Sequence, residues 1–259
     1  MARVLKFIQV NIYKGRYFQE LLEFLEAERP DVISAQEVTT GAVNFYEDKD
    51  ADLFELLKKA LQMEGVFHSD VEIKDEPNAA FGNAVFAKRP IIKSSVVKLK
   101  TFRPVTLSEF NNNTGNIWAR LPRHMLDAVV DLGDFKLHVI SVHARRIVPP
   151  ADDSENLRQA RLMAAYIESL GRALFILGGD FNIPPASEVI KTVCGAANNL
   201  MESSAIKQTL NPKVHELGDN GYLVDYIFTS RYFRLKSLQV PQVMVSDHLP
   251  VVVQLEFRP

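Results

Sequence analysis

The sequence predicts an α/β protein, because short apolar runs typical of strands alternate along the chain with segments whose apolar residues recur at helical spacing. A chain of 259 residues can bury a large core, and two-sheet α/β folds of this length are commonly one domain. The sequence contains no linker, repeat or low-complexity segment that would divide it. We therefore expect one domain that spans residues 1–259.

The first part of the chain alternates strand and helix and then becomes rich in strands. Helices are expected at 17–28, which Pro30 stops, and at 53–61, with Gly65 as the residue that closes the helix. The expected strands are 4–10, 31–36, 66–73, 81–87, 91–99, 117–121, 125–131 and 135–142. The turn at Gly133 and Asp134 indicates a hairpin between the last two.

The rest of the chain continues the alternation. Apolar residues at helical spacing between Leu157 and Leu170 indicate a helix, begun by Asp153 or Ser154 and ended by Gly171. The apolar run 174–177 is typical of a strand, and a short helix follows at 187–192. The last expected strands are 222–229, 233–240 and 249–257.

Composition limits the kind of protein and its surroundings. Hydrophobic residues make up 47% and charged residues 24%, which is typical of a globular chain. The single cysteine, Cys194, excludes an internal disulfide, and the N-terminal stretch lacks the pattern of a signal peptide. We expect a monomeric cytoplasmic protein without a membrane span or an obligate protein partner. The net charge of -2 neither supports nor excludes a nuclease.

Several expected strands deliver an acid, an amide or a histidine at their C-terminal ends. These residues are Asn11, Glu37, His143, Asp180 with Asn182, and Asp247 with His248. Ligands of α/β sheets commonly bind beyond strand ends, so we expect these side chains to converge on one site. Asp180 and Asn182 are two apart and point to the same face if the strand geometry persists; alternatively, they only close a turn before Pro184.

Asp225 differs because it lies inside the apolar segment 222–228. An unpaired carboxylate in such a strand would be costly, so Asp225 needs a partner. A histidine is the economical choice, since it can use one ring nitrogen for the carboxylate and keep the other free for a proton.

Seven segments occur in an order that resembles a known family. They are QVN ending at Asn11, DVISAQEV around Glu37, FGNAVFAKRPI at 81–91, SVH ending at His143, GGDFN, YLVDYIF and SDHLPVVV. They resemble successive motifs of the endonuclease/exonuclease/phosphatase superfamily, which includes the deoxyribonuclease I-like enzymes. The resemblance implies a four-layer α/β/β/α sandwich of two mixed sheets and a divalent-metal-dependent phosphoester hydrolase.

The resemblance also implies roles for individual residues. Glu37 would be the principal metal ligand, with Asn11 and Asp247 beside it, and His248 and Asp225 would form a catalytic pair. Asp180 and Asn182 would position the attacking water and the phosphate oxygens. His143 matches the histidine of the deoxyribonuclease and sphingomyelinase branches, and the segment near it departs from the abasic-site endonuclease branch.

The chemistry agrees with these roles. Hydrolysis of a phosphodiester needs a positive centre near the phosphate, and an oxygen-rich site suits Mg²⁺ or Mn²⁺. His248 and Asp180 both remain candidates for the general base. The expected substrate is a phosphodiester such as DNA or RNA. The alternatives are a phosphoester of a small molecule or lipid headgroup, and a binding module that lacks catalysis.

Other polar and aromatic residues carry weaker expectations. Asn83 and Arg145 are candidate phosphate contacts, although Asn83 could only close a turn and Arg145 could be solvated beside Arg146. Trp118 is expected in the core, with base stacking as the alternative. Four histidines without a surrounding motif are expected at the surface or in structural contacts: His68, His124, His138 and His215.

Overall fold

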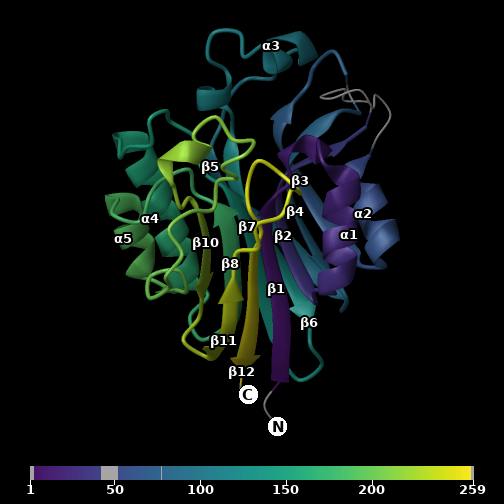
Figure 1. Ribbon diagram of the computed structural model, residues 1–259, viewed down its shortest axis with the longest axis vertical. Coiled ribbons are helices and arrows are strands. Elements are labelled where there is room, and N and C mark those ends of the chain that lie inside the picture. The colour runs from purple at the N-terminus through teal and green to yellow at the C-terminus, as the bar shows by residue number, and fades with distance from the viewer. Residues whose placement is uncertain (1–2, 42–51, 77, 258–259) are drawn as a thin grey trace.

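Two six-stranded β-sheets pack face to face between two layers of helices (Figure 1). The computed structural model describes residues 3–41, 52–76 and 78–257. Helices α1 (Phe18–Glu28) and α2 (Leu53–Leu61) cover one sheet, and α4 (Ser154–Ser169) and α5 (Glu188–Cys194) cover the other. This arrangement confirms the predicted four-layer α/β/β/α sandwich.

Each sheet mixes parallel and antiparallel pairs. In the first sheet, β1 pairs in parallel with β2 and antiparallel with β12, and the order is β11 (Phe233–Gln239), β12 (Val251–Phe257), β1 (Arg3–Asn11), β2 (Val32–Thr40), β4 (Ala80–Ala87) and β3 (Glu64–Glu72). In the second sheet, β7 pairs in parallel with β8, and the order is β5 (Ile91–Lys100), β6 (Arg123–Asp131), β7 (Lys136–His143), β8 (Leu174–Asp180), β10 (Asp225–Thr229) and β9 (Asn198–Asn199).

The helices are short and amphipathic, and most begin at a side-chain cap. They are α1 (Phe18–Glu28), α2 (Leu53–Leu61), α3 (Leu107–Asn111), α4 (Ser154–Ser169) and α5 (Glu188–Cys194). Asp153 accepts a hydrogen bond from the backbone N–H of Asn156 and so caps α4, as one of the two expected residues. No helix in the described part of the chain is long and apolar enough to cross a membrane.

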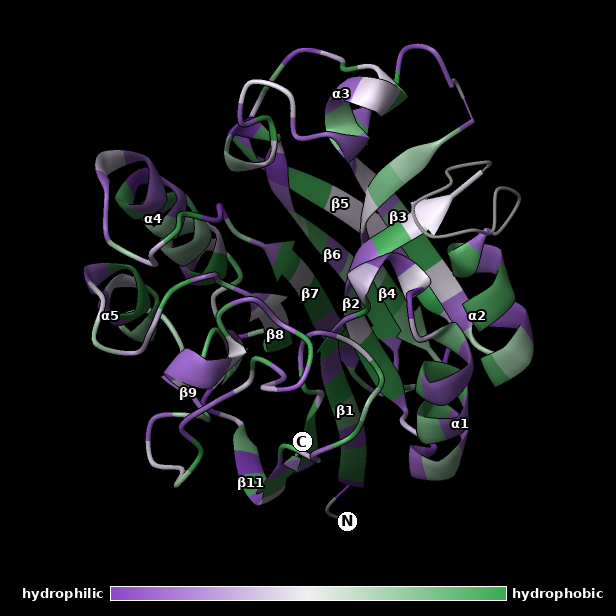
Figure 2. Cartoon of the chain, turned by 45° about the horizontal axis from the view of Figure 1, so that its top comes forward, coloured by the Kyte–Doolittle hydropathy of each residue, from purple (hydrophilic) through white to green (hydrophobic). Residues whose placement is uncertain are grey.

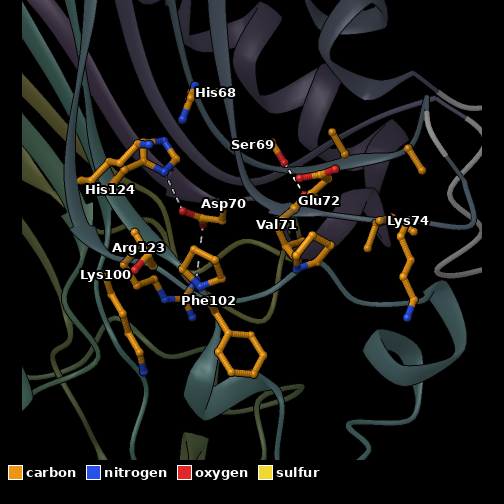
Figure 3. Close-up of a pocket in the computed structure, with 17 residues that line it drawn as sticks. His68, Ser69, Asp70, Val71, Glu72, Lys74, Lys100, Phe102, Arg123 and His124 are labelled. Atoms are coloured by element: carbon orange, nitrogen blue, oxygen red, sulfur yellow. Dashed lines mark hydrogen bonds and ion pairs between the residues drawn. The ribbon is translucent and has the colours of Figure 1, made fainter.

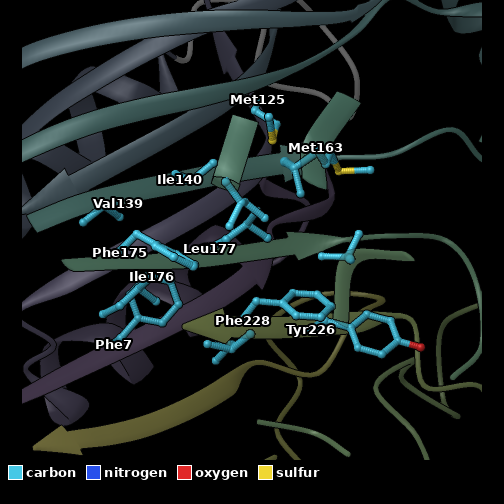
Figure 4. Packing of buried hydrophobic residues seen from close by; sticks show 14 of the residues in the cluster. Phe7, Met125, Val139, Ile140, Met163, Phe175, Ile176, Leu177, Tyr226 and Phe228 are labelled. Carbon is cyan, nitrogen blue, oxygen red and sulfur yellow. The ribbon is translucent and has the colours of Figure 1, made fainter. Parts of the chain in front are cut away.

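The main core lies between the two sheets. Phe7 of β1 points into it beside Ile176 of β8, whereas Met125, Ile140 and Leu177 lie on the opposite face of the second sheet, on the side of Met163 of α4 (Figure 4). Figure 2 shows hydrophobic residues along the strands and hydrophilic residues in many of the loops at their ends. A smaller cluster fills the space between the first sheet and helices α1 and α2.

Beneath the site described below, the two sheets are joined by buried polar contacts. Gln36 of β2 donates to Ser141 of β7 at 3.0 Å, and Ser34 donates to the carbonyl of Gly178 at 3.0 Å. Gly178 near the end of β8 permits this approach, because a Cβ there would lie 2.8 Å from the ring of Phe7 in the first sheet. The two sheets are therefore held in a fixed relation at this edge.

Two expectations about local structure are wrong. The segment 117–121 is a 3-10 turn at Trp118–Arg120 and not a strand. Gly65 does not close α2, because Gln62 takes the left-handed conformation there and Gly65 lies inside β3. The sequence analysis also did not foresee α3 and β9.

Candidate active site

A cavity of about 430 Å³ opens where the strands of both sheets end. Its polar lining includes residues from seven separate parts of the chain: Lys14, Glu37, Arg123, His143, Arg146, Asp180, Asn182, His215, Glu216, Asp247 and His248. Aromatic side chains line it as well: Tyr13, Phe81, Phe110 and Trp118. A cavity of this size is in the range of sites that bind small molecules or part of a polymer.

Strand register places the acidic and histidine residues of the second sheet side by side. Asp180 at the end of β8 is paired with His143 of β7 on one side and with Asp225 of β10 on the other. In the first sheet Asn11 ends β1, whereas Glu37 lies inside β2, which continues past the expected end to Thr40. The residues that the sequence analysis grouped by position at strand ends therefore meet where the two sheets face each other.

The carboxylate of Asp180 is the meeting point of these side chains. Its Oδ2 accepts a hydrogen bond from Asn11 Nδ2 at 3.1 Å and lies 3.5 Å from His143 Nε2 and 3.6 Å from His248 Nε2. Its Oδ1 accepts from the backbone N–H of Asn182 at 2.9 Å. Burial raises the pKa of Asp180 to about 7, and the charge of Asp225 adds to the rise, although His248 opposes it.

His248 is held between two carboxylates. Its Nδ1 lies 2.8 Å from Asp225 Oδ2, and the whole imidazole is buried. Burial alone lowers the pKa of His248, but the charges of Asp225 and Asp180 outweigh it and raise the pKa well above its ordinary value. His248 is therefore the histidine partner that was expected for Asp225 from its position in an apolar strand.

Glu37 occupies an unusual backbone position. It has φ of 56° at the point where the pairing of β2 with β4 shifts register, so a bulge turns its side chain into the cavity. Lys14 Nζ donates to Glu37 Oε2 at 2.8 Å. Burial raises the pKa of Glu37, but the charges of Lys14, His143 and His248 outweigh it and lower the pKa to about 2.

Glu37, Asp247 and Asn11 provide oxygen atoms that suit a hard divalent cation. Asn11 Nδ2 lies 3.4 Å from Glu37 Oε1, and Ser246 donates both to the carbonyl of Asn11 at 2.6 Å and to Asp247 Oδ1 at 3.2 Å. Burial is the largest cause that raises the pKa of Asp247, and the charge of Glu37 raises it further. Two carboxylates that disfavour each other's charge gain from a cation between them, so the residues fit a divalent metal.

A second combination of groups could also hold a cation. Ligand atoms of His215, Asp247 and His248 lie within 4.8 Å of one another. The buried group Asp180, Asp225 and His248 satisfies the same distance. His248 belongs to both of these groups, and Asp247 belongs to the first of them and to the set with Glu37 and Asn11.

His143 is buried next to cationic side chains. Burial, followed by the charge of Arg123, lowers its pKa well below the ordinary value. Its Nδ1 is buried without a hydrogen-bond partner among the residues that the structure describes. The imidazole is therefore neutral near pH 7, and Nε2 is the nitrogen that faces Asp180.

Two expected phosphate contacts do not line the cavity. Asn83 is fully buried and donates to the carbonyl of His124 at 3.3 Å. Arg145 forms an ion pair with Asp153 and donates to the carbonyl of Ala119. Its neighbour Arg146 lines the cavity instead, in an ion pair with Glu216. The sequence alone did not distinguish the two arginines.

Three residues of the cavity were missed or placed elsewhere by the sequence analysis. His215 was expected in a structural or surface role, yet its ring stands perpendicular to that of His248 at 5.5 Å. Burial and the charge of His248 lower the pKa of His215 to about 4. Trp118 was expected in the core but is 39% exposed at the cavity. Arg123, at the start of β6, had not been singled out.

The comparisons with known proteins agree with this geometry. The model of the endonuclease/exonuclease/phosphatase family matches residues 8–248. The chain belongs to the endonuclease/exonuclease/phosphatase family. Members of this family are phosphoester hydrolases, and the confirmed membership agrees with the resemblance that the motifs indicated. No curated protein matches the chain in a sequence search.

Solved structures resemble the whole chain at low sequence identity. The mannosyl-6-phosphatase Bt3783 of Bacteroides thetaiotaomicron VPI-5482 has a TM-score of 0.71 and 19% identity, over 97% of this chain and 99% of that one. The catalytic domain of human Nocturnin with bound sulfate gives 0.68 and 18%, over 98% and 95%. TDP2 of D. rerio with a single-strand DNA product gives 0.69 and 16%, over 97% and 98%. At these identities the likeness shows the shared fold.

Proposed function

We propose that the chain is a divalent-metal-dependent phosphodiesterase that hydrolyses nucleic acid. The observation that carries the proposal is the convergence of His143, Asn11 and His248 on the Asp180 carboxylate, beside the acidic pair Glu37 and Asp247 in one cavity. Such a cluster provides proton-transfer groups and cation ligands within reach of one phosphate.

In this proposal Glu37, Asp247 and Asn11 hold Mg²⁺ or Mn²⁺. The metal would supply positive charge for the phosphate oxygens. Lys14, which pairs with Glu37 in the structure, would add a second positive charge near the phosphate. His143 and Asn182 donate hydrogen bonds to the phosphate oxygens from the second sheet.

The attacking water passes its proton to a group on the protein. Asp225 orients His248 through Nδ1, so Nε2 points toward Asp180 and the cavity. Asp180, with a pKa of about 7, can accept a proton near neutral pH, and the raised pKa of His248 makes its protonated form a stabiliser of the charged phosphate. We therefore assign the base to Asp180 and charge stabilisation to His248.

Two features support a nucleic-acid substrate. Trp118 and Tyr13 present aromatic rings at the cavity, where they can stack on a base or sugar. Arg146 and Lys14 also line the cavity, each in an ion pair with an acidic residue, and both are cations that can contact a phosphate. The solved structure of D. rerio TDP2 contains a single-strand DNA product, which supports this substrate class for the fold.

The second candidate is a phosphatase that acts on a small molecule. The cavity volume of about 430 Å³ favours it, because a sugar phosphate would fill such a space. Bt3783, which shares the fold, is a mannosyl-6-phosphatase. The two candidates differ in whether the substrate extends beyond the cavity.

An activity panel separates them. The protein is assayed with Mg²⁺ and with Mn²⁺ on single-stranded DNA, duplex DNA, RNA, bis(p-nitrophenyl) phosphate and mannose 6-phosphate. We expect hydrolysis of a nucleic acid and of the diester, and none in excess chelator. Release of phosphate from mannose 6-phosphate without cleavage of any polymer would reject the proposal in favour of the phosphatase.

A further inference from the structure

A second cavity, of about 480 Å³, shares the side chain of Arg123 with the candidate active site. It lies between β3, the end of β5 and the start of β6 (Figure 3). Arg123 is almost fully buried and lines both cavities, so one cationic residue separates them. Its charge reaches the active site, because it is among the causes of the lowered pKa of His143.

A buried carboxylate fixes the position of Arg123. Asp70 Oδ2 accepts from Arg123 Nη1 at 3.3 Å, and Asp70 Oδ1 lies 2.7 Å from His124 Nδ1. Figure 3 shows Asp70 between these two partners, with His68 on the other side of His124. Asp70 Oδ2 thus holds the arginine that divides the cavities, while Oδ1 lies beside His124 without a hydrogen bond among the described residues.

The rest of the cavity carries an excess of positive charge. Lys74, Lys98 and Lys100 line it, and the other carboxylate in the lining is the exposed Glu72. In the described part of the chain, neither Lys98 nor Lys100 forms a salt bridge; Lys100 donates to the carbonyl of Ala119 at 3.3 Å. Burial, followed by the charge of Arg145, lowers the pKa of Lys100, and Arg123 and Arg120 act in the same direction. Cations gathered in this way repel one another until an anion joins them.

We propose that this second cavity binds a second phosphate group of the substrate while the scissile phosphate lies on the active-site side of Arg123. Lys98 and Lys100 contact the second phosphate, and Arg123 lies between the two. The ligand is a linear polyanion that carries at least two phosphates, as an oligonucleotide does. This inference rests on the proposed function and names the part of the nucleic acid that lies outside the active-site cavity.

The test compares substrates that have one phosphate with substrates that have many. The variant Lys98→Met/Lys100→Met keeps the length of both side chains and removes their charges. Lys93→Met is the matched control, because Lys93 is an exposed lysine on the same strand and lines neither of these two cavities. Each protein is assayed with Mg²⁺ on a thymidine octanucleotide and on bis(p-nitrophenyl) phosphate over a range of salt concentrations.

For the double variant we expect KM on the octanucleotide to rise about tenfold, which corresponds to about 1.4 kcal/mol. The slope of log KM against log salt concentration should become shallower by about one unit for each lysine removed. The kcat on the octanucleotide, and both constants on the diester with one phosphate, should stay within about twofold of the parent protein. The control variant should match the parent protein on both substrates.

Other outcomes overturn the inference. An equal loss on both substrates would mean that the lysines support the fold or the active site in general, and unchanged constants would mean that no phosphate binds there. If the parent protein hydrolyses the diester but not the octanucleotide, the nucleic-acid proposal fails. The second site is then decided by titration of the metal-free protein with inorganic pyrophosphate: weaker binding by the double variant supports an anion site, and an equal Kd excludes it.

Discussion

Asp180 Oδ2 lies 3.6 Å from His248 Nε2, while the other ring nitrogen of His248 lies 2.8 Å from Asp225 Oδ2. The imidazole thus joins two buried carboxylates, one from β8 and one from β10, whose strands pair directly at these residues. Both carboxylates act on the imidazole, because the charges of Asp225 and Asp180 raise the pKa of His248, and the charge of Asp225 also raises the pKa of Asp180. The three side chains should therefore behave as one unit.

The first prediction follows from this unit. We expect His248→Ala and Asp225→Asn each to lower kcat by about a hundredfold or more, and the double variant to be little worse than His248→Ala. Asp225→Asn keeps the shape of the side chain but removes the charge that holds and orients the imidazole. Steady-state kinetics of the three variants decide it. If the two losses multiply, Asp225 has a role that does not pass through His248.

The second prediction concerns Glu37. We expect Glu37→Gln to lower the affinity for Mg²⁺ or Mn²⁺ at least tenfold and to abolish turnover, with little change in the circular dichroism spectrum. The side chain is only partly buried and pairs with Lys14, so its replacement removes charge from the cavity rather than packing from the core. Titration with Mn²⁺ measures the affinity.

Glu20→Gln, an exposed change on α1, is the control for the loss of one carboxylate and should bind metal like the parent protein. Full activity of the parent protein in excess chelator would contradict the assignment of Glu37 to a metal. If Glu37→Gln keeps its affinity for the metal but loses turnover, Glu37 acts in another step of the reaction and not as a metal ligand.

The sequence predicted the convergence because polar side chains stand next to apolar strand segments, and ligands of α/β sheets commonly bind beyond strand ends. His143, Asp180 and Asp225 end or begin strands that are neighbours in the second sheet, and their alignment needs no information from the loops. The family motifs contributed the order of the strands. Both sources therefore place the polar residues of the sheet edge and say little about the walls of the cavity.

The walls of the cavity depend on tertiary contacts that the pattern of apolar residues in the sequence does not predict. Trp118 lies in a segment that was expected to be a strand. The buried residues of this segment, Ile117 and Leu121, are four apart, which is helical spacing, and the segment forms a 3-10 turn instead. Gly65 looked like a helix end, but it lies in β3, where a Cβ would lie 2.9 Å from Phe54 of the helix packed against it. Arg146 and His215 reach the cavity from irregular loops, whose course sequence periodicity cannot predict.

The third prediction uses the only tryptophan of the chain as a reporter. Trp118 Nε1 donates to the carbonyl of Phe110 in α3, at 2.7 Å, and α3 begins with a capping box formed by Thr106 and Glu109. Hydrogen bonds from Arg103 and from the backbone of Thr106 lower the pKa of Glu109 to about 2. Because the pKa is lowered, the ionised Glu109 carboxylate stabilises the folded protein. This stabilisation is complete above the ordinary pKa of 4.5 and is lost as the pH falls toward 2.

We therefore expect the emission of Trp118 to be constant from neutral pH to about 5 and to change between about 4.5 and 2. In Glu109→Gln the cap is already weakened at neutral pH, so the emission should be shifted there and the acid transition reduced. Far-ultraviolet circular dichroism measured in parallel separates this local change from unfolding of the whole chain. An acid transition that is identical in both proteins would exclude Glu109 as its source.

The last prediction concerns His143, whose role can be that of a proton donor to the leaving group or of a hydrogen-bond donor to a phosphate oxygen. Burial and the charge of Arg123 keep its pKa well below the ordinary value, so the free protein carries a neutral imidazole at this position. A neutral imidazole donates a hydrogen bond but has no extra proton to give. The geometry therefore favours a contact with the phosphate.

The two roles differ in their dependence on the leaving group. A missing proton donor slows hydrolysis of natural phosphodiesters and spares p-nitrophenyl esters, whose leaving group departs without a proton; a missing phosphate contact slows both alike. We expect His143→Ala to lower kcat/KM by about tenfold to a hundredfold on a thymidine octanucleotide and on p-nitrophenyl thymidine 5′-phosphate. His143→Gln, which keeps a hydrogen-bond donor but cannot transfer a proton, should recover part of the loss on both. A loss confined to the octanucleotide, with no recovery in the glutamine variant, would assign His143 to protonation of the leaving group, which would then require the bound substrate to raise its pKa.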